Sequence, residues 1–303
     1  MTTDNPRPAS QDTQQTDQRP PGPAKRRRHW AISILRIVVI AYATMLLMLM
    51  VMESRLVYPG AYAEPRDVLR QSQVQAFEYP AADGSTITGR RVDRAGSNRT
   101  VLFLHGNGIR ASWMDDWTLQ LSQQLDANVV TAEYRGFDDD DVTPTEANLI
   151  ADSLAAHDAV CKLYSLSPEE LIVYGRSLGG GCAAAVAAEK KSDTLILDRT
   201  FDSVVDVASD RFPMFPIRWV MRNRFDSVSR LQSFQGKLIQ IHGTPDRIVP
   251  IKNGKRLFES IPSSDKQFIE VPGLWHNDPM SNVTLKKIAQ RLPVRAGVEA
   301  SAD

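Results

Sequence analysis

Cysteine and histidine are scarce in this chain. The 303 residues include two cysteines and five histidines. Cys161 and Cys182 fall in separate predicted helices and lack the spacing of metal ligands, which favours two buried thiols over a disulfide or a metal site. We therefore expect that the protein binds no metal and needs no cofactor.

The chain also lacks an excess of charge of either sign. Lysine plus arginine and aspartate plus glutamate both number 36. A balanced chain has no overall attraction to nucleic acid, which we do not expect as a partner. Apolar residues make up 42% of the sequence, an ordinary value for a globular protein with a sizeable core. The length leaves room for one large α/β domain with a tail, or for two small domains.

Large apolar side chains are almost absent from the first 24 residues, which are rich in proline, glutamine, threonine and aspartate. Such a segment cannot recover the entropy lost on ordering. A basic cluster, Lys25-Arg26-Arg27-Arg28, follows it. We predict that residues 1–30 form a disordered tail with a basic end.

Residues 31–52 are strongly apolar and carry a single charge, at Arg36. A helix of this length spans the roughly 30 Å of a bilayer's hydrocarbon core, so we predict a transmembrane helix. The basic cluster before it predicts that the N-terminus is cytoplasmic. A single-pass protein of this orientation has its folded domain on the periplasmic, lumenal or extracellular side.

A cleaved signal peptide is the main alternative to an anchor. Such a peptide has a shorter apolar region with a small-residue cleavage site just after it. Ala61-Tyr62-Ala63 has suitable residues but lies well beyond Met52, which favours an uncleaved anchor. A twin-arginine signal fits less well, because the apolar segment is long. Residues 53–72, broken by Pro59-Gly60 and Pro65, are expected to form a short tether that keeps the domain close to the bilayer.

Residues 73–293 alternate between β-rich and amphipathic segments. This alternation predicts an α/β domain in which a mostly parallel central sheet has helices on both faces. We expect strands at 74–79, 86–92, 99–104, 129–133, 171–174, 194–197, 237–241 and 267–271. We expect helices at 112–125, 145–164, 182–188, 253–260 and 280–292. The acidic run 138–141 is interpreted as a solvated loop rather than a calcium site, and residues 294–303 as a flexible C-terminus.

The central motif is Gly175-Arg176-Ser177-Leu178-Gly179, which lies between an expected strand and an Ala-rich helix. A strand that turns sharply into a helix strains the residue at the bend, and only small neighbours leave it room. The turn would hold the Ser177 hydroxyl at a helix N-terminus, where negative charge is favoured. The alternative is a glycine-rich turn with an incidental serine.

A nucleophilic serine needs a base, and the base needs an acid that orients it. Chemistry in parallel sheets gathers at the carboxyl ends of the strands. His276 follows the last expected strand, whereas the other four histidines lie beside the apolar segment, inside a helix or at glycine turns. Asp246 also follows a strand and is the favoured acid. Asp198 is the second choice, and Asp278 is expected to stabilise its own loop.

Four motifs carry a family resemblance: His105-Gly106-Asn107, Gly175-x-Ser-Leu-Gly-Gly180, the segment 242–250 and His276-Asn277-Asp278. With the order Ser177, Asp246, His276, they resemble the α/β-hydrolase superfamily over about residues 74–292. They are most similar to membrane-anchored members with little or no cap, which include acyl-protein thioesterases and lysophospholipases. The resemblance implies an oxyanion hole formed by the N–H groups of Asn107 and Leu178. The sequence departs from the family pattern at Asp138, where a small residue is expected.

An insert at about 201–233 takes the place where larger relatives carry a helical lid. Its segment 212–224 interleaves apolar and basic residues, with room for one short helix. The insert is expected either to pack beside the entrance or to form an interfacial patch toward anionic lipid. In the second case Phe212, Phe215 and Trp219 would contact the substrate.

The sequence therefore predicts a membrane-anchored serine hydrolase that cleaves acyl esters or thioesters of lipid-like or acylated substrates. A serine peptidase with the same triad is one alternative, because the fold also hydrolyses amides. A catalytically silent membrane protein that uses the fold for binding is another. The sequence does not indicate the oligomeric state.

Overall fold

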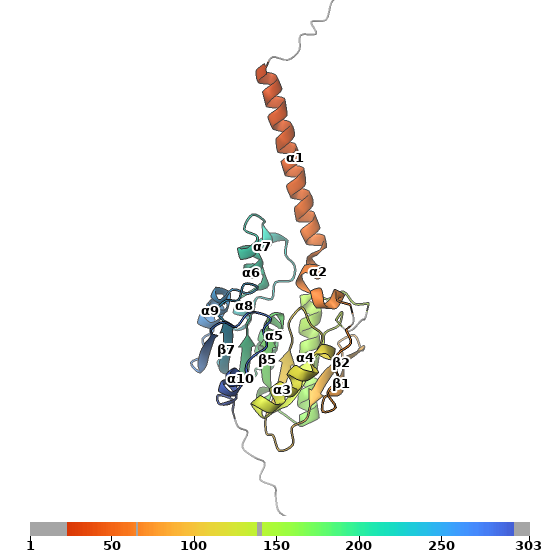
Figure 1. Ribbon diagram of the computed structural model, residues 1–303, viewed down its shortest axis with the longest axis vertical. Helices are drawn as coiled ribbons and strands as arrows, with labels where there is room; N and C mark the ends of the chain where they lie inside the picture. The colour runs from red at the N-terminus through yellow and green to blue at the C-terminus, as the bar shows by residue number, and fades with distance from the viewer. Residues whose placement is uncertain (1–22, 65, 138–140, 294–303) are drawn as a thin grey trace, which may run out of the picture. The chain divides into compact units, whose positions relative to one another are not determined.

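The computed structural model describes residues 23–64, 66–137 and 141–293 (Figure 1). Most of the predicted N-terminal tail, the first three residues of the acidic run, Asp138 among them, and the C-terminal segment lie outside these ranges. The chain forms two compact units, divided after Leu49.

The first unit consists mainly of the helix α1, Pro23–Val51. Its part Arg27–Val51 is 25 residues long and has a mean hydropathy of 2.5, enough to cross a membrane by length and composition. A signal sequence passes the same test. The helix begins ahead of residue 31 and includes the basic cluster, because alanine, lysine and arginine favour helix and proline is well tolerated in the first turn.

The second unit is built on an eight-stranded sheet with the order β1-β2-β4-β3-β5-β6-β7-β8. β1 pairs antiparallel with β2, and β2 with β4, whereas all other neighbours are parallel. The mostly parallel sheet predicted from the alternation is thus confirmed. The strands are β1 Gln75–Pro80, β2 Thr86–Val92, β3 Thr100–Leu104, β4 Asn128–Ala132, β5 Ile172–Arg176, β6 Thr194–Asp198, β7 Lys237–Gly243 and β8 Lys266–Val271.

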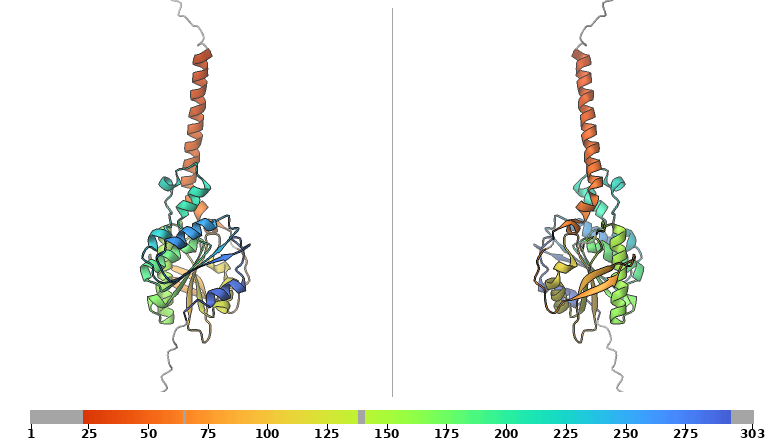
Figure 2. Two further views of the ribbon diagram at one scale, coloured as in Figure 1. Left: turned by 90° about the vertical axis from the view of Figure 1, so that its left-hand side faces the viewer. Right: turned by 90° about the vertical axis from the view of Figure 1, so that its right-hand side faces the viewer.

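Helices cover both faces of the sheet, and the strands supply each face with alternate side chains (Figure 2). Val101 and Phe103 of β3 belong to one apolar cluster, and Leu102 and Leu104 belong to the other. The first cluster packs under α3 Asp115–Leu125 and α10 Asn282–Ala289. The second lies under α4 Glu146–Tyr164, α5 Leu178–Lys190 and α9 Ile251–Ser260.

The expectation of an irregular tether at 53–72 is wrong for its first half. Residues Glu53–Val57 form the short helix α2, and Pro59–Tyr62 form the 3₁₀ helix η1. Tyr58 between them is fully buried and meets the rings of Phe137 and Phe225 edge to face. The segment is ordered because it carries an aromatic side chain that fills the core of the second unit.

The segment 212–224 contains one short helix, α7 Ile217–Val220, as expected. The rest of the insert adds two further helices, α6 Val204–Arg211 and α8 Ser227–Arg230. Ser203 caps α6 by accepting the N–H of Asp206, and Asp226 caps α8 by accepting the N–H of Ser229. These two caps are the local signals that start the additional helices.

Candidate active site

Ser177 lies at the sharp turn between β5 and α5, with φ 52° and ψ −119°. This left-handed backbone is strained for a residue with a side chain. The turn leaves no room for larger neighbours: a Cβ on Gly179 would lie 2.0 Å from the carbonyl oxygen of Leu104. Two hydrogen bonds hold the strained residue, one from its N–H to the carbonyl of Asp198 and one from the Thr200 hydroxyl to its own carbonyl. The glycines therefore belong to a turn that presents the serine.

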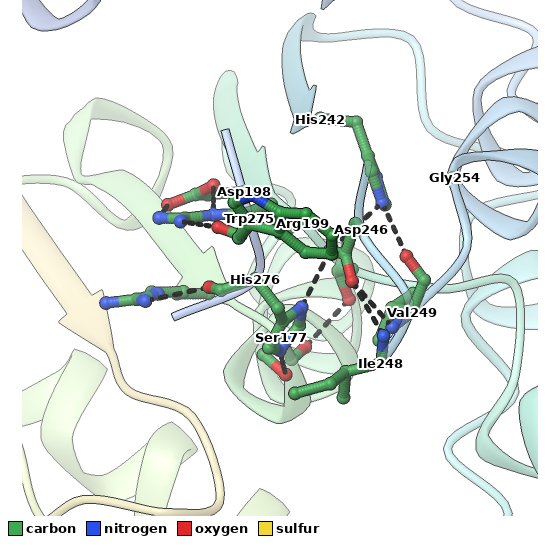
Figure 3. A network of polar contacts seen from close by, with 12 residues as sticks. Ser177, Asp198, Arg199, His242, Asp246, Ile248, Val249, Gly254, Trp275 and His276 are labelled. Atoms are coloured by element: carbon green, nitrogen blue, oxygen red, sulfur yellow. Dashed lines mark hydrogen bonds and ion pairs between the residues drawn. The ribbon is translucent and has the colours of Figure 1, made fainter. Parts of the chain in front are cut away.

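The structure brings Ser177, His276 and Asp246 together from three different loops (Figure 3). Oγ of Ser177 lies 2.9 Å from Nε2 of His276, and Nδ1 of His276 lies 2.7 Å from Oδ2 of Asp246. If Nδ1–H donates to the carboxylate, Nε2 is left to accept the serine hydroxyl. All three side chains are largely buried. The chain of hydrogen bonds can move a proton from serine to imidazole.

Asp246 is fixed by the turn after β7. Its Oδ1 accepts the backbone N–H groups of Ile248 and Val249, each over 2.9 Å. Nε2 of His242 lies 3.5 Å from its Oδ2. Burial alone would raise the pKa of Asp246, but hydrogen bonds from His242, His276 and the Val249 N–H hold that pKa below its usual range. The carboxylate is therefore charged and rigidly oriented.

Asp198, the second choice for the acid, has another partner. Its carboxylate oxygens accept Nε and Nη2 of the fully buried Arg199, at 2.8 and 3.0 Å. Burial would raise the pKa of Asp198, but the Arg199 guanidinium keeps that pKa below its usual value. The carboxylate that lies within hydrogen-bond distance of the His276 imidazole is that of Asp246.

Arg199 is a functional candidate that the sequence reasoning missed. Its Nη1 donates to the carbonyl of Trp275 over 3.0 Å (Figure 3). The same Nη1 donates to the carbonyl of Asp278 over 2.8 Å, so Arg199 spans the loop that carries His276. Arg176 adds a bond from Nη2 to the carbonyl of His276 over 3.1 Å. The adjacent pair Asp198-Arg199 at a strand end was the available signal.

Leu178 directly follows the serine in the chain, and the neighbour of Asn107, Gly106, lies beside it. Leu178 is the first residue of α5. Asn107 follows Gly106, where a Cβ would lie 3.3 Å from the Cβ of Ser177. The carbonyl of Asn107 accepts the N–H of Gly60 over 2.8 Å, and its Nδ2 donates to the carbonyl of Val57 over 2.9 Å. The segment after α2 therefore holds the Asn107 loop in place.

His105 and His157 belong to the framework of the domain. Nε2 of His105 lies 2.8 Å from Oε1 of the buried Glu133, whose Oε2 accepts the N–H of Ala111. His157 lies within α4, where burial lowers its pKa. Within the described ranges, no three His, Cys, Asp or Glu side chains gather in a way that could hold a metal ion.

The predicted substrate contacts lie in the insert. Phe212 and Trp219 are exposed and Phe215 is half-buried.

A mostly parallel sheet with a strained serine at the β5–α5 turn defines an α/β hydrolase. Residues 101–293 match the model of the alpha/beta hydrolase family. The chain belongs to this family, as the sequence motifs indicated.

Relatives of the chain come from bacteria and animals. An uncharacterized protein of Mycobacterium tuberculosis is 27% identical over 267 residues, which cover 84% of this chain and 90% of the relative. Alpha/beta hydrolase domain-containing protein 17C of Xenopus tropicalis is 30% identical over 206 residues, covering 68% of this chain and 65% of that protein.

Solved structures support the same fold. The Pyrococcus furiosus esterase Pf2001 superposes with a TM-score of 0.59 at 18% identity, covering 75% of this chain and 95% of the esterase. The metagenomic carboxylesterase EstE1 superposes with a TM-score of 0.56 at 17% identity, covering 79% and 91%. At this identity the likeness concerns the fold alone.

Proposed function

We propose that the protein is a membrane-anchored serine hydrolase that cleaves acyl esters or thioesters, with Ser177 as nucleophile, His276 as general base and Asp246 as the acid that orients it. The observation that carries the proposal is the continuous hydrogen-bond chain from Oγ of Ser177 through His276 to Asp246, at 2.9 and 2.7 Å. Two solved structures with the same fold are esterases, so the fold accommodates this chemistry.

The reaction proceeds through an acyl-enzyme. Nε2 of His276 takes the hydroxyl proton while Oγ of Ser177 attacks the acyl carbonyl. The N–H groups of Asn107 and Leu178 stabilise the oxyanion, a type of contact worth roughly 10²–10³ in rate per donor. His276 then gives its proton to the leaving alcohol or thiol, and water releases the acyl group by the same route.

A fluorophosphonate probe on the full-length protein in detergent tests the assignment. We expect one covalent adduct, on Ser177, and loss of labelling and turnover in Ser177→Ala. Ser192→Ala removes another buried hydroxyl and serves as the control, which should keep both labelling and turnover. Labelling that persists at another residue would overturn the assignment, and no labelling at all would favour a silent binding protein.

The substrate class is tested by a p-nitrophenyl ester series of increasing acyl length, run beside lysophospholipid, acyl-thioester and aminoacyl-anilide substrates. We expect turnover of esters and thioesters. Anilide turnover that exceeds ester turnover would favour the peptidase alternative.

The membrane anchor is the second part of the proposal. The length and composition of Arg27–Val51 support a transmembrane helix, and the basic residues at its start support a cytoplasmic N-terminus. Cleavage after Ala63 would remove the fully buried Tyr58, which supports an uncleaved anchor. Protease added outside spheroplasts should digest the domain; protection of the domain from that protease would refute this orientation.

A further inference from the structure

The insert carries a surface that combines exposed apolar side chains with arginine. Between residues 211 and 224 the sequence has four arginines and no acidic residue. Trp219 is 90% exposed and Met214 is 82% exposed, and Phe212 is also exposed. Contact with water does not stabilise a tryptophan side chain in this position, whereas the interface of a bilayer favours its amphipathic ring. The insert surface is defined by Arg211, Phe212, Met214, Arg218, Trp219, Arg222 and Arg224.

The acidic side chains next to the insert surface do not neutralise its positive charge. Asp206 forms an ion pair with Arg218, and Glu146 accepts the backbone N–H of Arg224 and pairs with Arg230. Asp210 pairs with Lys252. The side chains of Arg211, Arg222 and Arg224 are exposed. The composition is that of an interfacial element, in which arginine meets anionic headgroups and the apolar side chains dip below them.

Hydrogen bonds within the chain hold the insert next to Glu53 and Tyr58. Oε1 of Glu53 accepts the N–H groups of Arg222 and Asn223, at 2.9 and 2.8 Å, and Nδ2 of Asn223 at 2.8 Å. The hydroxyl of Tyr58 donates to Oδ1 of Asn223 over 2.7 Å. α1 ends at Val51, two residues before Glu53, and two residues reach at most about 7–8 Å. The insert is therefore bound to the residue at which the chain leaves the apolar helix (Figure 1 shows α2, α6 and α7 at the same end of the domain).

We propose that the insert surface is a second membrane contact, seated in the headgroup layer of an anionic bilayer. The inference rests on the proposed anchor, because that anchor sets Glu53 at the membrane surface. Glu53 ties the insert to the exit of the helix, the arginines bind lipid phosphates, and Trp219 and Met214 enter the interface. Long-chain acyl substrates that are dissolved in the bilayer then reach the hydrolase at the bilayer surface.

Quenching of tryptophan fluorescence by brominated lipids tests the contact directly. Full-length protein with Trp30→Phe is placed in nanodiscs with bromines at shallow acyl positions, with and without phosphatidylglycerol. We expect quenching in the parent, and its loss in Trp219→Phe but not in Trp117→Phe, a half-buried core position used as the control. Quenching should be stronger with phosphatidylglycerol. Equal quenching in the parent and in Trp219→Phe would overturn the proposal.

A second measurement separates this proposal from the proposed hydrolase. The triple change Arg211→Gln, Arg222→Gln and Arg224→Gln should lower turnover of a long-chain ester embedded in phosphatidylglycerol vesicles about 10-fold, and leave p-nitrophenyl acetate turnover unchanged. Lys286→Gln with Lys287→Gln, exposed on α10, is the matched control. Equal turnover on vesicles would refute the membrane contact while labelling of Ser177 still stands. A selective loss on acylated peptides would instead assign the surface to a protein substrate.

Discussion

The backbone N–H of Gly60 donates to the carbonyl oxygen of Asn107 over 2.8 Å, and so connects the segment after the apolar helix to the loop beside Ser177. Nδ2 of Asn107 returns the contact by donating to the carbonyl of Val57. Arg110 adds a bond from its Nη2 to the carbonyl of Ala63, over 2.8 Å. The proposed oxyanion loop is thus held by the residues that follow the apolar helix in the chain.

Gly60→Ala should impair catalysis without unfolding the protein. A Cβ at this position would lie 2.8 Å from the carbonyl oxygen of Asn107 and 2.9 Å from the N of Ile109, so the loop has to move. A displacement of about 1 Å in a catalytic loop can cost roughly 10²-fold in rate. We expect kcat for a p-nitrophenyl ester to fall by about that factor with a small change in KM. Gly108→Ala is the control, because its Cβ would meet open space; an equal loss in both variants would contradict the positioning role.

Asp246→Asn should lower kcat strongly while the fold persists. An amide accepts the hydrogen bond of His276 poorly and favours the wrong tautomer, an effect of roughly 10⁴-fold in serine protease triads. Asp278→Asn, in the same loop as His276, should change kcat less than about 10-fold because it caps the N–H of Trp275. Fluorophosphonate labelling rates give a second readout. Near-wild-type labelling of Asp246→Asn would assign the orienting role to another carboxylate.

Arg199→Met should have two effects: it should destabilise the protein, and it should disturb the His276 loop. The change leaves Asp198 buried without its partner, a situation that costs about 3–5 kcal/mol. The carbonyls of Trp275 and Asp278 lose their donor as well. We expect a lower free energy of unfolding in urea and a lower kcat at temperatures where the variant is folded. Arg291→Met, whose exposed ion pair with Asp265 spans 3.4 Å, is the control and should cost under 1 kcal/mol. Unchanged kcat in folded Arg199→Met would limit Arg199 to a structural role.

Stability should fall at acid pH because of Asp198. Its folded-state pKa is lowered below the value of about 3.9 typical of an unfolded chain. The unfolded chain therefore takes up the proton first, and the stabilisation is complete above pH 4–5 and is lost as pH falls through the lowered pKa. Urea unfolding between pH 7 and pH 3 should show this loss. In Asp198→Asn the dependence should be weaker; an identical pH profile would show that other carboxylates dominate.

Local patterns were sufficient for the strands, the strained serine turn and the expectation that His276 lies near Ser177. The apolar run of β3 and the glycines around Ser177 depend only on their local structure. Strands that end in polar residues indicate one edge of a parallel sheet. The sequence order could not show that Tyr58 bonds Asn223, because the partners are 165 residues apart. The same reason explains why residues 53–63 were mistaken for a tether. Arg199 was missed because its role depends on which strands are neighbours, a property of the sheet and not of the segment.

Tyr58 fills the core of the hydrolase although it precedes the first strand by seventeen residues. A different N-terminal segment fused directly ahead of Gln75 would leave an aromatic-sized void between Phe137 and Phe225 and would release the loop of Asn107. The boundary at which evolution or an engineer could exchange the apolar helix therefore lies ahead of Glu53. A soluble enzyme prepared by truncation should keep that residue as its first.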